Sequence, residues 1–162
     1  MTYPRMLIGF SVVLLLAGCG PVSAPESTQG DTTPIQLAAP DGHTVTLSVE
    51  LARTVDEQQQ GLMNRTALAY GAGMLFIFPD SAERSFWMKD TLLPLDIIFF
   101  DAEGLVVSMA SMEPCVTADD ALCPSTFSQG PAQFALEVPK GYLAAASVEE
   151  DWRLILGPWA SL

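Results

Sequence analysis

The stretch that decides the fold occupies residues 84–101 and has the sequence Arg-Ser-Phe-Trp-Met-Lys-Asp-Thr-Leu-Leu-Pro-Leu-Asp-Ile-Ile-Phe-Phe-Asp. Its first five residues have strand character, residues 90–94 have turn character, and residues 97–100 are apolar on both faces of a strand. A run of the last kind predicts a strand covered on both sides, at the centre of a sheet. Lys89 and Asp96 flank the turn, so this stretch is expected to supply both core residues and a polar site.

The composition indicates a soluble, acidic, globular body. The chain has 162 residues, of which 49% are hydrophobic and 16% charged, so one domain with targeting and linking segments is expected. Seven basic residues against 19 acidic ones give a formal net charge of −12. That charge opposes binding to nucleic acid or to an anionic membrane surface.

The N-terminus has the pattern of a bacterial export signal. Arg5 precedes residues 7–18, an uncharged and mostly apolar segment that is shorter than the roughly 20 residues of a membrane-spanning helix. The ending Leu16-Ala17-Gly18-Cys19 resembles the lipoprotein processing site, in which the cysteine thiol receives a diacylglyceryl group. We therefore expect residues 1–18 to be a signal peptide and Cys19 to be the lipid anchor. An ordinary cleaved signal and a short membrane anchor are the alternatives.

The segment after the expected anchor is predicted to be a flexible linker. Residues 19–41 combine proline with Ser, Thr, Gln and Gly and contain no Lys or Arg. Gly20 stands where an Asp would signal retention in the inner membrane, so the lipoprotein resemblance implies the outer membrane, facing the periplasm. A single globular domain is predicted for residues 42–157 and a C-terminal tail for residues 158–162.

The domain is predicted to be rich in strands. Alternating polarity predicts a strand at residues 45–51, and a capping box of Thr54 and Glu57 then predicts a short helix that ends near Met63. Further strands are expected at residues 74–78, 84–88, 97–100, 105–112, 132–138 and 152–156, with a long loop at 113–130 and a helical turn at 142–147. The predicted fold class is α+β: a compact β-rich domain, mostly antiparallel sheet or barrel-like sandwich, with one short helix after the first strand.

Two cysteines remain once Cys19 is assigned to the lipid. In an exported chain Cys115 and Cys123 are expected to form a disulfide across the long loop. A metal pair is the rival interpretation, but a spacing of seven intervening residues without a nearby His is poor zinc geometry.

Several motifs occur together in the order found in one known family. They are Gly61-Leu62-Met63-x-Arg65, Gly73-Met74-Leu75-Phe76-x-Phe78, Phe86-Trp87-Met88-Lys89-Asp90-Thr91, Pro94-Leu95-Asp96-Ile97-Ile98-Phe99, Pro114-Cys115, Cys123-Pro124, Gly130-Pro131 and Leu136-Glu137. In these motifs the chain resembles the bacterial and archaeal family called domain of unknown function 192, over about residues 43–156. The resemblance implies a compact β-rich α+β fold and an exported protein, and it brings no established activity. The chain departs from the family at Glu149-Glu150-Asp151-Trp152, where many relatives have Gly-Asp before the last strand.

The sequence contains few of the patterns that carry catalysis. The one histidine, His43, is at the predicted edge of the domain, and no phosphate-binding glycine loop is present. Glu113, Asp119 and Asp120 lack the alternating spacing of a calcium loop. We expect no cofactor and no metal.

One set of charged residues lies within or beside apolar runs, where an unpaired charge is costly. Its members are Arg65, Arg84, Lys89, Asp96 and Glu137. Three interpretations are open for this set. They are structural ion pairs, a pocket in which Arg65, Arg84, Lys89 and Asp96 bind a small anionic or sugar ligand, and an enzyme that uses Asp96 and Glu137 as acid and base.

Asp96 directly precedes the doubly apolar run, so it is expected to be partly buried and paired with a cation. We predict that Lys89, or failing it Arg65 or Arg84, supplies that cation, at the rim of the main concave site. The first functional hypothesis is a lipid-anchored envelope domain that binds a ligand or partner. The alternatives are a small carboxylate-dependent hydrolase acting on envelope glycan and a structural envelope spacer that packs against another protein.

Overall fold

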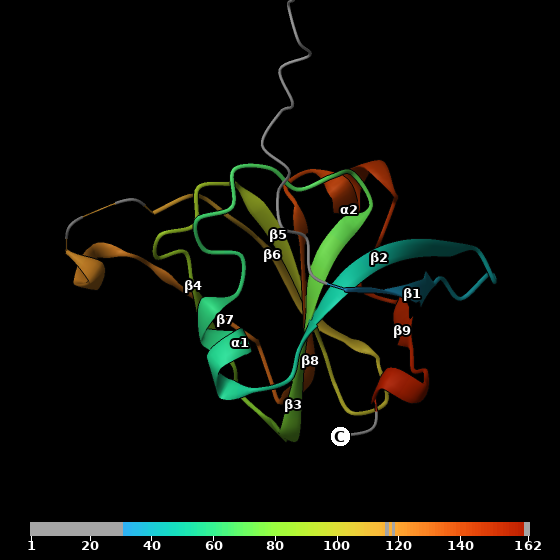
Figure 1. The fold of residues 1–162 in the computed structure, drawn as a ribbon. Helices are drawn as coiled ribbons and strands as arrows, with labels where there is room; N and C mark the ends of the chain where they lie inside the picture. Colours follow the sequence, from blue (N-terminus) through green and yellow to red (C-terminus); the bar gives the residue numbers. More distant parts are fainter. Residues whose placement is uncertain (1–30, 116, 118, 161–162) are drawn as a thin grey trace, which may run out of the picture.

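The central feature of the fold is a seven-stranded sheet with the strand order β6-β5-β8-β3-β2-β1-β9, which curls into an open half-barrel (Figure 1). The computed structural model describes residues 31–160 except 116 and 118. Strands β2 and β3 pair in parallel, and the other pairs are antiparallel. The strands are β1 (Thr32–Ala38), β2 (Thr44–Ala52), β3 (Ala72–Ala82), β5 (Leu95–Phe100), β6 (Val106–Met112), β8 (Ala132–Pro139) and β9 (Arg153–Ile155). The predicted β-rich, mostly antiparallel fold is confirmed.

Smaller elements cover the two faces of this sheet. Strands β4 (Ser85–Trp87) and β7 (Ser125–Phe127) form a separate two-stranded sheet, which lies beside helix α1 (Val55–Gln60) in Figure 1. Helix α2 (Tyr142–Ala145) follows β8, and the 3-10 turns η1 (Asp120–Leu122) and η2 (Pro158–Ala160) complete the elements. No helix in the described part of the chain is long and apolar enough to cross a membrane.

The sheet separates two apolar clusters. Ile98, Leu136 and Val138 belong to the cluster on the side of α2, whereas Ile97 and Phe99 belong to the cluster on the side of α1. All six residues of β5 are buried, because its alternate side chains enter the two clusters. The expectation that this strand is covered on both faces is confirmed. Its position is one strand from the sheet edge rather than at the centre, since β6 follows it as a hairpin.

Two strands lie where the sequence predicted none. The predicted linker extends to residue 41, but β1 occupies part of it and pairs with β2 along its whole length. Ile35 and Leu37 are buried while Pro34 and Gln36 are exposed, so the alternation of a strand is present but is masked by the proline. Strand β9 pairs only with the end of β1 beyond Pro34, which leaves the proline on an unpaired edge. The second unexpected strand, β7, lies within the predicted long loop.

The helices follow the expected local signals. The capping box of Thr54 and Glu57 is present, and α1 ends at Gly61, which has a positive φ of 45°. Because β1 precedes β2, this helix follows the second strand rather than the first. The helical turn expected at residues 142–147 is α2, so the described residues contain two short α-helices rather than one.

The predicted cysteine pair is confirmed in the structure. Cys115 and Cys123 are joined, with their Cα atoms 5.7 Å apart, inside the range for a disulfide. Strand β7 begins two residues after Cys123, and Lys89, just beyond β4, forms a β-bridge with Cys115. The cysteine pair therefore holds one end of the small sheet beside α1, the end at which Trp87 pairs with Ser125.

Candidate functional site

Glu137 is a carboxyl in the middle of the main sheet. It lies on β8, opposite Met74 of β3 on one side and Ile97 of β5 on the other. Its side chain is only 4% exposed. Strand parity places it on the face of the sheet that carries Ala135 and is covered by α1 and β4. An ionisable group at such a position is unusual, because the interior disfavours unpaired charge.

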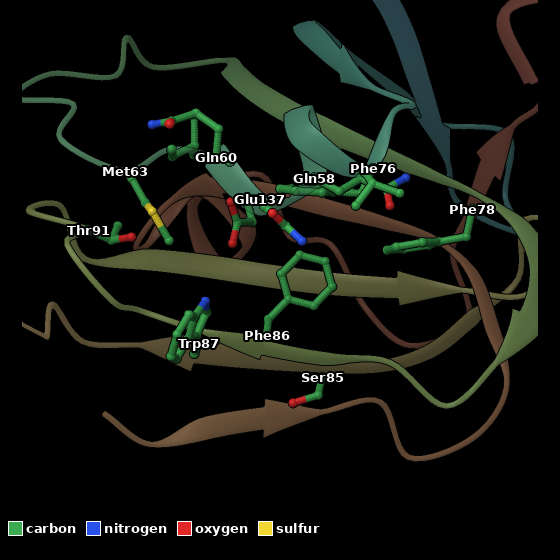
Figure 2. A pocket seen from close by; sticks show the side chains of 14 residues that line it. Gln58, Gln60, Met63, Phe76, Phe78, Ser85, Phe86, Trp87, Thr91 and Glu137 are labelled. Atoms are coloured by element: carbon green, nitrogen blue, oxygen red, sulfur yellow. The ribbon is translucent and has the colours of Figure 1, made fainter. Parts of the chain in front are cut away.

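A pocket opens over this carboxyl. Its volume is about 260 Å³, and Figure 2 shows the side chain of Glu137 reaching into it between α1 and β4. The wall contributed by α1 and the following turn consists of Val55, Gln58, Gln59, Gln60, Gly61, Leu62 and Met63. The opposite wall and floor consist of Phe76, Phe78, Ser85, Phe86, Trp87 and Thr91. The pocket is thus lined by aromatic rings, neutral amides and hydroxyls, with Glu137 as its one ionisable residue.

The charge state of Glu137 follows from its surroundings. Within the described residues it forms no ion pair, and no side chain donates a hydrogen bond to it. Burial raises the pKa of Glu137 from the ordinary 4.5 to about 8. The carboxyl is therefore mostly protonated at neutral pH. Because its pKa is close to neutral, a bound ligand could change its protonation state.

Local sequence features hold the two walls in place. The side-chain amide of Gln58 donates to the carbonyl of Ile77 at 2.9 Å, which ties α1 to β3. In the neighbouring strand β3, Gly73 lies against the backbone carbonyl of Glu137, and a Cβ at this position would approach that oxygen to 2.4 Å. Only glycine allows β3 and β8 to pack this closely at Glu137.

The aromatic wall is a connected set of rings. Phe86 makes edge contacts with Phe76 and Phe99, with ring centroids 4.8 and 5.6 Å apart. The guanidinium carbon of Arg84 lies 4.1 Å from the centre of the Phe78 ring, and the ammonium of Lys89 lies 5.5 Å from that of Trp87. Two rings of this wall therefore already bind cations of the protein itself.

The three predicted cationic ligands are paired with carboxylates elsewhere. Arg65 forms two hydrogen bonds of 2.6 Å with Glu50, and Arg84 is 2.8 Å from Asp80. Lys89 pairs with Asp120 and not with Asp96. None of the three lines the pocket over Glu137. The observed contacts match the interpretation of these residues as structural ion pairs.

The predicted ion pair of Asp96 is wrong. Asp96 is 4% exposed, as expected for a buried residue, but its partners are neutral. The hydroxyl of Ser111 donates to Oδ1 at 2.6 Å, and the backbone N–H of Gly141 donates to Oδ2 at 2.8 Å. Strand β6 supplies the first donor and the β8–α2 connection supplies the second, so Asp96 holds together two segments that are distant from it in sequence. It borders a separate shallow hollow with Lys140, which itself pairs with Glu113.

Asp96 and Glu137 do not converge on one site. Asp96 is the cross-strand partner of Val138, and Ile97 is the partner of Glu137. Cross-strand partners point to the same face, so neighbouring positions 137 and 138 place the two carboxyls on opposite faces of the sheet. A glycosidase needs both carboxyls on one cleft, and this pair lacks that geometry.

Sequence reasoning missed most of the pocket lining. The glutamines of α1 and the side chains of Met63 and Thr91 carried no motif, because they come together only when α1 docks beside β4. One signal was available: Glu137 interrupts a run in β8 that is buried on both faces. Among the described residues no group of three or more His, Cys, Asp or Glu side chains could hold a metal ion.

Comparisons with known proteins place this architecture among uncharacterised relatives. The model of the family domain of unknown function 192, described as "Uncharacterized ACR", matches residues 36–156. A crystal structure of a putative transcription regulator from Sinorhizobium meliloti 1021 is 30% identical, with a TM-score of 0.69, and the match covers 76% of this chain and 92% of that one. A protein of unknown function from Novosphingobium aromaticivorans DSM 12444 is also 30% identical, with a TM-score of 0.67 and coverage of 77% and 85%. No curated protein matches the chain.

Proposed function

Because the chain belongs to the family called domain of unknown function 192, whose fold carries a pocket here, we propose that it is a lipid-anchored envelope domain that binds a small polar ligand over Glu137. The proposal has two parts, the ligand site and the membrane anchor, and each has its own support and its own test.

One observation carries the ligand site. Glu137 is a buried carboxyl that has no charged partner among residues 31–160 as described, and its side chain reaches a pocket of about 260 Å³. A buried polar group that is not satisfied within the protein is costly, and a ligand that donates a hydrogen bond to it would offset that cost. Apolar walls with a few convergent polar groups are the usual composition of small-molecule sites.

The charges around the pocket support a narrower choice of ligand. The expected anion-binding role of Arg65, Arg84 and Lys89 has no support in the contacts, since each of them pairs with a carboxylate of the protein. An anion would also meet Glu137 itself. The Sinorhizobium relative is described as a putative transcription regulator, but for this chain a net charge of −12 opposes binding to DNA.

A fragment screen monitored by NMR tests the ligand site. Trp87 lines the pocket, and Figure 2 shows its indole nitrogen on the side of the ring toward Glu137, so its indole N–H signal reports on the site. We expect small polar fragments to shift this signal, and to do so less in Glu137→Leu. The signal of Trp159, which lies in a different groove beside β1, is the internal control. Fragments that shift only Trp159, or none that shift Trp87, would contradict a ligand site over Glu137.

The anchor is supported by the sequence alone, since residues 1–30 lie outside the described part of the chain. The Leu-Ala-Gly-Cys ending of the apolar segment makes Cys19 the acylated residue of the proposal. We expect the Cys19→Ala protein to shift from the membrane pellet to the soluble fraction of cell lysates. Wild-type protein fractionated in parallel provides the control. A Cys19→Ala protein that still pellets with washed membranes at the wild-type level would rule out the lipid anchor.

A further inference from the structure

We propose that the ligand of this pocket carries a protonated amine, whose ammonium group lies over the Glu137 carboxylate and against the aromatic wall formed by Phe86 and Trp87. This inference rests on the proposed function and specifies the chemical class of its ligand. Three features of the pocket and one of the whole molecule favour an ammonium group over a hydroxyl or an anion.

The first feature is the missing counter-charge. The residues that pack on Glu137 from β3 and β5 are Met74 and Ile97, both apolar. Of the charged residues around the pocket, Arg65 and Glu50 pair with each other, as do Arg84 and Asp80, and Lys89 and Asp120. On α1, Asp56 is acidic and Glu57 caps its own helix. None of these cations forms an ion pair with Glu137, and a ligand cation would complete the pair.

The second feature is a pair of hydrogen-bond acceptors. The amide nitrogen of Gln58 donates to the carbonyls of Ile77, Ala52 and Arg53, at 2.9, 3.4 and 3.4 Å. The atom that Gln58 can still offer to a ligand is its side-chain oxygen, which accepts. Beside the amides, hydroxyls and indole of its other lining residues, the pocket therefore presents two acceptors, in Gln58 and Glu137. An ammonium group carries several N–H donors, whereas a hydroxyl carries one.

The third feature is the aromatic wall. In Figure 2 the ring of Phe86 is seen face-on next to the Glu137 carboxyl, and Trp87 stands beside it. Ring faces attract cations, most strongly where water is excluded. The contacts of Arg84 with Phe78 and of Lys89 with Trp87 show that rings of this wall are already oriented for such interactions. A carboxylate beside aromatic faces is the arrangement that recognises an alkylammonium group.

The fourth feature is the long-range field. A net charge of −12 raises the local concentration of cations and lowers that of anions at any opening of the surface. This field acts on every site of the molecule. It therefore favours a cationic ligand over an anionic one, but it does not favour this pocket over any other. The pocket itself is selected by Glu137.

Proton release accompanies this mode of binding. The ammonium group requires ionised Glu137, and burial raises the pKa of that carboxyl to about 8. Below this pKa the ionised fraction rises about tenfold with each pH unit, while an alkylamine keeps its proton throughout the range. The affinity for an amine should therefore rise by about tenfold per pH unit below about pH 8, whereas the affinity for a neutral compound should not rise.

Three compounds with the same ring test the inference on the full soluble domain. Benzylamine, benzyl alcohol and benzoate present a cation, a neutral hydroxyl and an anion, and each is titrated against the Trp87 indole signal at about pH 8, near the pKa of Glu137. We expect benzylamine to bind at least about tenfold more tightly than benzyl alcohol, and benzoate to bind most weakly. Glu137→Gln, which keeps the shape of the side chain, should reduce the preference for benzylamine to less than about threefold.

Asp96→Asn is the matched control, because Asp96 is equally buried but lies on the opposite face of the sheet. It should leave the preference unchanged. If benzyl alcohol binds as tightly as benzylamine, or if Glu137→Gln keeps the full preference, the ammonium inference is overturned while the ligand site survives. If none of the three compounds nor any screened fragment moves the Trp87 signal, the ligand site fails as well.

Discussion

Replacing Glu137 with glutamine is expected to stabilise the folded protein by about 3–5 kcal/mol at about pH 8. The side chain is 4% exposed and has no ion pair among the described residues, so burial favours its protonated form and raises its pKa from 4.5 to about 8. In the unfolded chain the same carboxyl ionises freely. Glutamine has nearly the same shape and never ionises, so it removes this difference between the two states.

The pH dependence of the effect has a definite sign. Because the folded pKa is above the unfolded one, the unfolded chain loses this proton first as the pH rises. The contribution of Glu137 to stability is therefore fully present below pH 4.5 and is lost progressively up to about pH 8. Wild type and Glu137→Gln should be within about 1 kcal/mol of each other near pH 4.5 and should diverge above it.

Urea unfolding of both proteins across this pH range measures the effect, and the difference between them cancels the titration of all other groups. A constant difference between the two proteins at every pH would show that folding does not raise the pKa of Glu137. In that case its role as the unpaired base of the pocket would be lost. The expected gain in stability also has a functional meaning, since a group that destabilises a fold is commonly one that serves a site.

Replacing Asp96 with alanine is expected to destabilise the protein by about 3–4 kcal/mol. The change removes the acceptor of two hydrogen bonds, from the hydroxyl of Ser111 and from the backbone N–H of Gly141. Both donors would then be left in a buried environment without a partner. The large effect thus has a different origin from the salt bridge that the sequence suggested.

Two further variants separate these explanations. Asp96→Asn should cost less than about 1 kcal/mol, because its amide oxygen can accept from Gly141 and its amide nitrogen can donate to Ser111 once that hydroxyl rotates. The effects of Asp96→Ala and Lys89→Ala should add within about 0.5 kcal/mol, since Lys89 pairs with Asp120 instead. Chemical unfolding of wild type, the three single variants and the Asp96→Ala/Lys89→Ala double variant measures both quantities. An asparagine variant as unstable as the alanine variant, or strong coupling to Lys89, would restore an essential role for charge at Asp96.

The sequence by itself determined the local elements whose signals depend on near neighbours. The alternation at residues 45–51 became β2, the capping box at Thr54 became the start of α1, and the doubly apolar run at residues 97–100 became a fully buried strand. Each of these depends on periodicity or on contacts a few residues apart. The cysteine pair was also predictable, because its partners are eight positions apart in one loop. Strand β1 was not predictable in this way, because Pro34 is rarely found inside a strand. The structure shows that Pro34 is tolerated since β9 does not pair with β1 at that position.

Only the tertiary structure decided which charges meet and which face of the sheet each side chain occupies. Lys89 pairs with Asp120 because the loop after Cys115 packs beside it. Arg65 pairs with Glu50 because β2 brings that carboxylate next to it. Asp96 and Glu137 were separated because their strands are neighbours in a register that offsets them by one residue. A shift of one position reverses the face of a strand residue, and no local pattern specifies the register between β5 and β8. The pocket over Glu137 exists for the same reason, since α1, β4 and β8 are distant in sequence and enclose it only after they pack together.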